Sequence, residues 1–213
     1  MNVEIRKISE PDYSAIVKVT REAFWDLYVP GCDEHYLAHV MCTHPDYMAE
    51  LSFVAMYEDS IVGSIQYTRS HIISTTGARI DTCTFGPISV EPRYQRQGIG
   101  GALINHSAQA AMKSGCKAII ILGNPFNYFK YGFRSSSDFA ISDREGKYPF
   151  GLLVRELEKG FLTNAAGTFH YSAVYDSIDK SAVEQFDAQF ESKAKGYSYT
   201  QDLFALACRA YCF

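Results

Sequence analysis

The first forty residues show one alternating pattern followed by two helical patterns. Residues 3–8 alternate between apolar and polar side chains, as a half-buried strand does. Residues 13–28 place apolar side chains at helical spacing, and Pro30 and Gly31 break that pattern. Residues 34–41 predict a second helix. The chain is therefore expected to open with one strand and two helices.

The next part of the chain predicts three strands. Residues 51–57 and 61–70 are strand-like runs joined by a short polar turn, which is typical of a hairpin. A third strand is predicted over 79–90, where Gly86 and Pro87 interrupt the run. Proline cannot donate a hydrogen bond to a sheet, and glycine tolerates unusual backbone angles. This pair therefore predicts a bulge or a splay within the strand.

A glycine-bearing loop follows, and after it the pattern predicts a helix over 98–113 and a buried strand over 117–122. A short helix is predicted over 127–131, ending at Gly132. The apolar stripe of the longer helix is predicted to contain Ile99, Leu103, His106 and Ala110.

Beyond residue 133 the periodicity weakens. Residues 152–157 and 168–175 predict strands, and residues 180–193 predict a helix. The segment 197–213 ends in several large apolar side chains, including Phe213. This segment is expected either to complete the sheet or to contact a second subunit.

Strands and helices alternate along the chain, which predicts an α/β or α+β domain around a mixed sheet. The length of 213 residues suits a single domain. We expect a core over residues 1–160 and a C-terminal extension over residues 161–213.

The composition, with 47% hydrophobic and 21% charged residues, is that of an ordinary globular protein. The net charge is -4 and Lys and Arg form no long run, which counts against a nucleic-acid partner because phosphate binding needs clustered cations. No apolar stretch approaches the roughly 20 residues of a membrane span, and the polar N-terminus does not resemble a signal peptide. These features predict a cytoplasmic protein without a membrane partner. The six cysteines include no CxxC pair and are expected to be reduced and mostly buried.

The loop before the long helix has the features of an anion site. The first turn of a helix leaves N–H groups unpaired and carries partial positive charge. Gly98 and Gly100 have no Cβ to hold a pyrophosphate away, and Arg96 can add charge at the rim. The spacing fits neither the nucleotide-triphosphate loop nor the full dinucleotide motif. A glycine-rich helix start without any ligand is the alternative.

The run from Gly86 to Leu103, GPISVEPRYQRQGIGGAL, closely resembles the central motif of GNAT acetyltransferases. Residues 124–133, NPFNYFKYGF, resemble the next motif of that family, in which a tyrosine precedes a Gly-Phe pair by four residues. Residues 21–36 and 183–197 look like an uncharacterised bacterial branch of it. The resemblance covers most of the chain.

This resemblance implies a GNAT-type acyl-CoA N-acyltransferase fold with a splayed central strand pair. The pantetheine arm of acetyl-CoA is expected to pair with the backbone of the strand before the loop. The pyrophosphate is expected to bind the N–H groups of the loop. The residues implied as cofactor-binding are Ile88, Ser89, Val90, Gln95, Arg96, Gln97, Gly98, Ile99, Gly100 and Gly101.

Tyr128 matches the family tyrosine that protonates the departing thiolate of coenzyme A, and a phenol with an ordinary pKa near 10 is a suitable acid. The alternative is a core aromatic residue, and Tyr131 competes for the same role. Asn124 is expected either to contact the cofactor arm or to cap the helix that begins at Pro125.

The implied activity is transfer of an acetyl group from acetyl-CoA to a primary amine by direct attack in a ternary complex. No Cys or Ser nucleophile lies in the motif, which favours direct attack. A non-catalytic acyl-CoA-binding sensor is the alternative, and a homodimer is common in the family. No carboxylate is identified as the general base. Three were considered and are expected to be solvated surface groups: Glu22, Asp81 and Glu91.

The segment 32–44 contains two cysteines and three histidines, which raises the question of a metal site. It contains neither a C-x-x-C nor an H-E-x-x-H frame. Ordinary structural roles, or contact with the acceptor beside Trp25, Asp33 and Glu34, are the favoured interpretations. No metal is expected.

Overall fold

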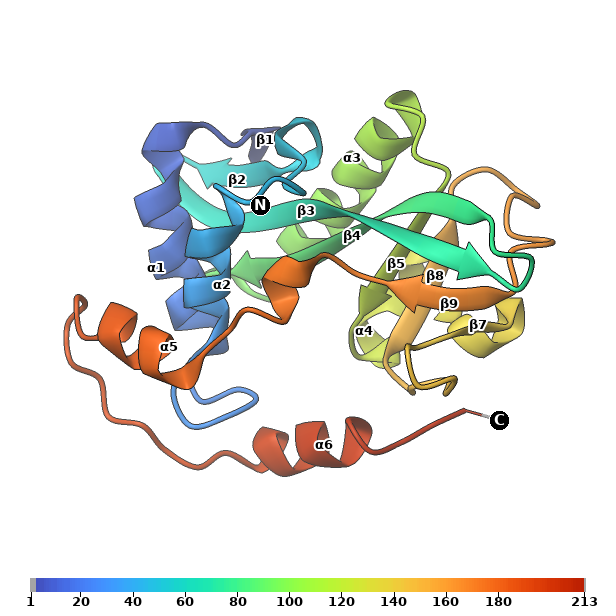
Figure 1. Cartoon of the computed structure of the whole chain (residues 1–213). Helices are drawn as coiled ribbons and strands as arrows, with labels where there is room; N and C mark the ends of the chain where they lie inside the picture. Colours follow the sequence, from blue (N-terminus) through green and yellow to red (C-terminus); the bar gives the residue numbers. More distant parts are fainter. Residues whose placement is uncertain (1–2, 213) are drawn as a thin grey trace.

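A computed structural model describes residues 3–212, which surround one nine-stranded sheet (Figure 1). Neighbouring strands are antiparallel except for the parallel pairs β4–β5 and β7–β9. The mixed sheet predicted from the sequence is thus confirmed. Strand β9 (Gly167–His170) lies outside the main order of strands and pairs with β3 and with β7 (Ile141–Ser142). The main path runs in the order β1 (Glu4–Lys7), β2 (Phe53–Tyr57), β3 (Ser60–Ser74), β4 (Arg79–Val90), β5 (Ala118–Leu122), β8 (Leu152–Glu156) and β6 (Arg134–Ser135).

The break predicted inside the third strand is a bulge in β4. Ile65 of β3 faces Ile88, whereas Tyr67 faces Phe85, so two residues of β4 lie opposite one residue of β3. The extra residue falls at the Gly86-Pro87 pair, where proline supplies no N–H to the ladder.

The parallel strands β4 and β5 separate soon after they meet. Their register contains one pair of partners, Cys83 and Ile119. Beyond it β5 pairs along its whole length with β8 on its other side, and the two strands diverge in Figure 1. The splay predicted for the central strand pair is therefore present, and it leaves an open gap beside the second half of β4.

Helices cover both faces of the sheet. Helices α1 (Tyr13–Phe24) and α2 (Glu34–Met41) pack on one face, and α3 (Ile99–Lys113) packs on the opposite face (Figure 1). None of the helices in the described residues 3–212 combines the length and apolar character needed to cross a membrane.

The predicted apolar stripe of α3 is partly wrong. His106 is exposed and Ala110 is only half-buried. Other side chains of α3 are buried instead, and three of these are small, which lets α3 approach the sheet closely. The buried positions of α3 are Ile99, Leu103, Ile104, Ser107, Ala108 and Ala111.

The start of α1 is held by a compact polar cluster. Asp12 accepts hydrogen bonds from Arg6 at 2.7 and 2.8 Å and from the backbone N–H of Ser9 at 2.8 Å. These partners hold the pKa of the Asp12 carboxyl well below its ordinary value. The helix predicted to reach residue 28 ends at Phe24, because Trp25 leaves the helical region with ψ 122°.

Other boundaries also differ from the sequence prediction. The strand expected over 168–175 ends at His170, and the helix expected over 180–193 is α5 (Lys180–Asp187). The expected helix over 127–131 is α4 (Pro125–Tyr128) followed by a 3-10 turn. The short strands β6 and β7 carried no sequence signal. The 3-10 turns span Glu10–Asp12, Ala49–Leu51, Pro92–Tyr94, Phe129–Tyr131, Ser136–Phe139 and Ala173–Tyr175.

Helix α5 docks on α1 through a largely buried ion pair. Arg21 Nε donates to Asp187 at 2.7 Å, and its guanidinium also donates to the carbonyl of Glu191 at 3.2 Å. The Arg21 side chain is 6% exposed. This contact ties the C-terminal extension to the first helix. The extension does not start at residue 161 in structural terms, since β9 belongs to the sheet.

The C-terminal segment does not complete the sheet as a strand. It contains helix α6 (Tyr199–Ala207), and Phe213 lies outside the described residues. Thr200 Oγ1 donates to Leu27 O at 2.7 Å, at one end of the segment. Cys212 N donates to Tyr148 O at 2.7 Å, at the other end. Residues 197–212, here called the C-terminal strap, thus join the loop after α1 to the loop before β8 (Figure 1).

Candidate functional site

The open edge of β4 lies between the bulge and α3. Glu91 N donates to a β3 carbonyl at 2.9 Å. Backbone groups of successive residues in a strand point to opposite edges, so Ser89 pairs with β3 while Ile88 and Val90 face the gap toward β5. The Gln95 side chain donates to Val90 O at 3.0 Å, on the gap side. Of the three backbone positions expected to face a cofactor arm, Ser89 is a correction, because its ladder bonds go to β3.

The loop after β4 presents a row of backbone donors. From Arg96 to Gly101, no backbone N–H donates to an acceptor within residues 3–212. Arg96 and Gly98 have φ values of 58° and 89°, and such left-handed positions turn neighbouring N–H groups into one concavity. The side chain of Gln97 donates back to Arg93 O at 3.2 Å, which fixes the loop. These unpaired N–H groups lie at the positive end of α3, where negative charge is favoured.

Two neighbouring glycines of this helix start differ in their surroundings. A Cβ on Gly100 would meet only Val90 Cγ2, at 3.8 Å. A Cβ on Gly101 would collide with the Tyr131 hydroxyl and lie 3.0 Å from its Cζ. Packing against Tyr131 therefore explains why residue 101 is a glycine. No contact within residues 3–212 requires a glycine at residue 100. The open space beside Gly100 suits a group that lies against the first turn of α3.

Tyr128 stands at the end of α4, on the β5 side of the gap. Its ring packs between Phe85 and Phe133, with centroids 5.9 and 5.8 Å away. Its hydroxyl has no hydrogen-bond partner within residues 3–212. Burial, followed by the nearby hydroxyls of Tyr28 and Tyr131, raises the pKa of Tyr128 well above 10. Tyr128 is therefore a protonated phenol at neutral pH.

Asn124 caps the helix that carries Tyr128. Its Oδ1 accepts from Phe126 N at 3.1 Å, and Pro125 follows at the first helical position. The capping alternative for Asn124 is thus present, and the amide nitrogen of this side chain has no partner within residues 3–212.

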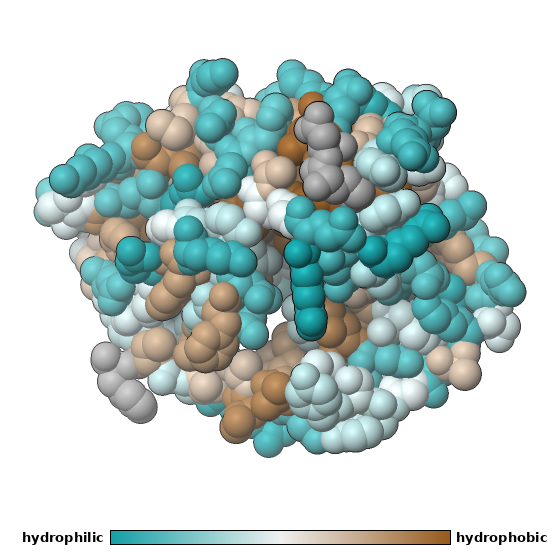
Figure 2. Space-filling view, turned by 180° about the vertical axis from the view of Figure 1, so that it is seen from behind, coloured by the Kyte–Doolittle hydropathy of each residue, from teal (hydrophilic) through white to brown (hydrophobic). Residues whose placement is uncertain are grey.

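The face opposite to that of Figure 1 is hollowed near its middle, and hydrophobic residues gather at the lower edge of the hollow (Figure 2). Three apolar side chains at the end of β5 and in the helical segment that follows it are exposed, namely Leu122 at 60%, Phe126 at 84% and Phe129 at 44%. Apolar surface of this kind next to an open strand edge is typical of a ligand groove.

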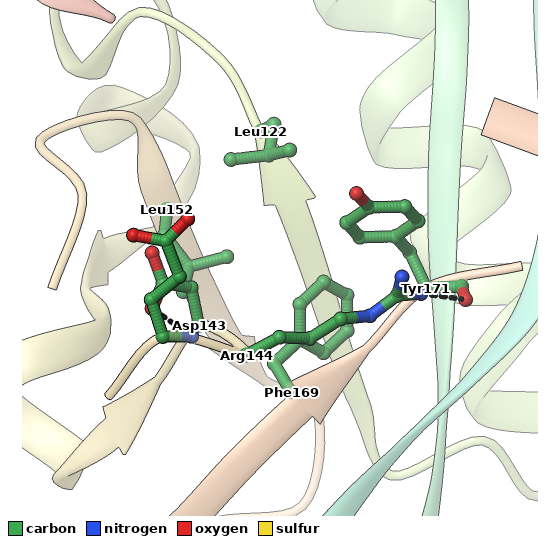
Figure 3. A pocket seen from close by; sticks show the side chains of 7 residues that line it. Leu122, Asp143, Arg144, Leu152, Phe169 and Tyr171 are labelled. Carbon is green, nitrogen blue, oxygen red and sulfur yellow. Dashed lines mark hydrogen bonds between the residues drawn. The ribbon is translucent and has the colours of Figure 1, made fainter. Parts of the chain in front are cut away.

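A pocket of about 210 Å³ is lined in part by Leu122. Arg144 reaches across it toward Tyr171 and lies 4.4 Å from the centre of that ring (Figure 3). Arg144 also pairs with Asp176 at 2.9 Å, and Asp143 accepts from two backbone N–H groups. Arg144 and Asp143 are thus both held by other groups of the protein. The pocket is lined by Leu122, Asp143, Arg144, Glu145, Leu152, Phe169 and Tyr171.

Comparison with known proteins adds to this geometry. The profile of the Acetyltransferase (GNAT) family matches residues 17–133, which is more than half of the chain. The chain belongs to this family. The matched region of the GNAT protein contains the splay between β4 and β5, the loop with the unpaired N–H groups of residues 96–101 (here called the donor loop) and Tyr128. Helix α5 and the C-terminal strap lie beyond it.

Relatives and similar structures agree with this assignment. The GNAT protein is 34% identical over 86 residues to the uncharacterised N-acetyltransferase YjhQ of Escherichia coli strain K12, and this match covers 39% of the chain and 45% of YjhQ. The chain thus spans less than half the length of that relative. Its fold is similar to the GNAT family N-acetyltransferase YhbS from Escherichia coli in complex with CoA, with TM-score 0.73, 19% identity and coverage of 84% and 94% of the two chains. It is also similar to a GNAT family acetyltransferase from Brucella melitensis in complex with acetyl-CoA, with TM-score 0.65, 23% identity and coverage of 82% and 99%.

The three carboxylates considered as a general base all lie in ion pairs. Glu22 accepts from Lys193 at 2.7 Å, and Asp81 accepts from Arg79 at 2.8 Å. Glu91 pairs with the neighbouring Arg93. Glu22 and Asp81 are exposed, as the sequence predicted, whereas the Glu91 side chain is partly buried with 21% exposed.

The cysteines and histidines of the segment 32–44 of this GNAT protein point in different directions. His35 is fully buried, and its Nε2 lies 3.2 Å from Asp187. His39 stacks on Phe186 with centroids 4.6 Å apart. Within residues 3–212 no group of three or more His, Cys, Asp or Glu side chains is arranged to hold a metal ion. The cysteines are less buried than predicted, since Cys208 is exposed and only Cys32 and Cys83 are fully buried.

Two residues that sequence reasoning did not assign to the site lie beside Tyr128 or the bulge. Tyr28 contributes to the raised pKa of Tyr128. Tyr175 donates from its hydroxyl to Gly86 O at 3.1 Å and thus covers the bulge of β4. A tyrosine in a loop has no sequence signal that separates such a place from an ordinary surface position, because the contact joins residues 89 positions apart.

Proposed function

We propose that this protein is an N-acetyltransferase that transfers an acetyl group from acetyl-CoA to a primary amine by direct attack in a ternary complex. The observation that carries the proposal is the row of unpaired N–H groups from Arg96 to Gly101, directly after a strand whose edge is open. Family membership supports it, and both similar structures described above hold CoA or acetyl-CoA.

The donor would bind along a continuous line of this chain's backbone. The N–H groups of residues 96–101 and the helix dipole suit the pyrophosphate. The groups of Ile88 and Val90 that face the gap suit the amides of the pantetheine arm, which would pair with β4 as an added strand. Acetyl-CoA supplies the activated acetyl group as a thioester. The free amide nitrogen of Asn124 is available to the same arm.

Tyr128 is assigned as the general acid. As the neutral amine nitrogen bonds to the acetyl carbon, the carbon–sulfur bond breaks and the sulfur takes the phenolic proton. The acetylated nitrogen then loses its extra proton to water, and water returns a proton to the phenolate. The raised pKa of Tyr128 keeps that proton in place before the reaction. Tyr131 is the weaker candidate, because its hydroxyl lies against Gly101 at the other end of the proposed donor site.

Calorimetric titration with acetyl-CoA tests the donor site. Wild type is expected to bind, and Gly100→Trp is expected to lose binding because the new ring would fill the space beside the first turn of α3. Asn105→Trp places the same side chain on an exposed position of the same helix and serves as the control. Equal binding by all three proteins, or no binding by wild type, would contradict the proposal.

Release of free CoA thiol in the presence of a panel of primary amines then tests the reaction. Amine-dependent thiol release would support an acetyltransferase. Binding of acetyl-CoA without thiol release for any amine would instead indicate a non-catalytic acyl-CoA sensor.

A further inference from the structure

Two cysteines lie against each other where β4 and β5 meet, just before the strands separate. Cys83 Sγ is 2.6 Å from Cys116 Sγ. Cys83 belongs to the single register pair that the two strands share, opposite Ile119, and Cys116 lies in the turn between α3 and β5. No other two cysteines bring their sulfur atoms into such contact within residues 3–212.

The two thiols have different surroundings. Cys83 is fully buried in the core between the sheet and α3, whereas Cys116 is only half-buried. The hydrogen bond from Cys83 lowers the pKa of the Cys116 thiol, and burial raises the pKa of the Cys83 thiol. Because the thiolate is the reactive form of cysteine, Cys116 is the sulfur that can attack a dissolved reagent. Cys83 lies directly behind it.

The backbone already holds the two sulfur atoms in place for a covalent bond. Cys116 N donates to Ala111 O at 2.9 Å, which ties the turn to the end of α3, and Cys116 Sγ lies 3.2 Å from Ala118 O at the start of β5. Cys83 Sγ also approaches Ala118 O, at 3.7 Å. A disulfide bond between two sulfur atoms measures about 2.05 Å, so small rotations of the two side chains would join them without a change of the sheet.

We propose that Cys83 and Cys116 form a redox-active pair that hydroperoxides oxidise to an intramolecular disulfide. The Cys116 thiolate attacks one peroxide oxygen, the O–O bond breaks, and water or an alcohol leaves with the proton that the thiol released. Cys83 Sγ then attacks the sulfur of the resulting sulfenic acid. The S–S bond forms as the S–O bond breaks, and the hydroxide that leaves takes the Cys83 proton to give water. Two electrons pass from the sulfur atoms to the peroxide. A dithiol reductant reverses the reaction by thiol–disulfide exchange.

The disulfide would enclose the segment 83–116. This segment contains the bulge of β4, the donor loop and the whole of α3. A covalent link of this kind restricts the unfolded chain more than the folded one. The oxidised protein should therefore melt about 5–10 °C above the reduced protein. This inference is independent of the proposed acetyl transfer, since it needs no bound donor.

The test uses the purified full-length chain. The protein is treated with hydrogen peroxide, the remaining thiols are blocked, and tryptic peptides are analysed by mass spectrometry without reduction. Trypsin releases peptides 80–93 and 114–117, each with one cysteine. We expect these two peptides to be joined, and we expect a rise in Tm that dithiothreitol reverses. Cys208→Ser removes an exposed cysteine and should behave like wild type, so it is the matched control. Cys116→Ser should show neither the joined peptides nor the rise in Tm.

Three results would overturn the proposal. Cys208 could be oxidised while the two peptides stay separate, the link could form only after the protein is unfolded in urea, or Cys116 could reach the sulfinic acid without any link to Cys83. The peptide analysis is made on wild type, so it decides the proposal even where Cys116→Ser fails to fold.

Discussion

Replacing Gly100 by alanine should raise the stability of the protein and lower its affinity for CoA. Gly100 is the second residue of α3, and the added methyl group would meet one atom, Val90 Cγ2, at 3.8 Å. That is ordinary van der Waals contact, so the variant folds without strain. The same methyl group would stand in the concavity formed by the N–H groups of residues 96–101.

The two effects have opposite signs. Alanine is favoured over glycine in a helix, and near the helix start this gains about 0.5 kcal/mol, which for a domain of this size raises Tm by about 1–2 °C. Loss of one charge-assisted hydrogen bond to the pyrophosphate costs about 1.5–3 kcal/mol. The Kd for CoA should therefore rise about 10–150-fold.

Thermal melting without ligand and calorimetry with CoA measure the two quantities on the same samples. Gly101→Ala is the contrasting variant, because its methyl group would collide with the Tyr131 ring and should cost about 1–2 kcal/mol of stability. A higher Tm for Gly100→Ala with unchanged CoA affinity would refute the assignment of the donor loop. A lower Tm would refute the description of the space beside Gly100.

Three further predictions follow from contacts described above. Tyr128→Phe should lower kcat for thiol release about 10–100-fold with unchanged CoA affinity, whereas Tyr131→Phe should stay within about threefold of wild type; equal losses would contradict the assignment of the acid. Asp187→Asn removes the charge that pairs with a buried guanidinium of α1 and should cost about 3 kcal/mol in urea unfolding; a loss below about 0.5 kcal/mol would mean that α5 docks by other contacts. Because Arg6 holds the folded-state pKa of Asp12 below its unfolded value near 3.9, this carboxylate stabilises the protein above that pH. The stability difference between wild type and Asp12→Asn should therefore shrink as pH falls from about 4 to 2, and a constant difference in urea unfolding would contradict this.

Local sequence signals predicted the donor side of the molecule well. The helix over 34–41 and the strand over 79–90 have the predicted bounds. The Gly86-Pro87 pair marked the bulge because both residues act on their own backbone. The glycine loop could be identified for the same reason, since a helix start and its free N–H groups are set by neighbours in the chain.

The contacts of the C-terminal strap could not be predicted in this way. Tyr28 and Phe204 stack on one another by tertiary packing, which no local sequence rule predicts. The stripe of α3 failed at His106 because spacing alone does not show how much of a helix the sheet covers.

The C-terminal strap also has a consequence for the order in which the protein is made. Every residue of the proposed donor site lies before residue 133, and the last strand of the sheet ends at His170. Since a ribosome adds about 5–20 residues per second, the donor side leaves it several seconds before residues 197–212. A nascent chain stalled before Tyr197 would thus carry the loop of residues 96–101 and the splay without the C-terminal strap, and its binding of acetyl-CoA would show whether the proposed donor site needs the strap.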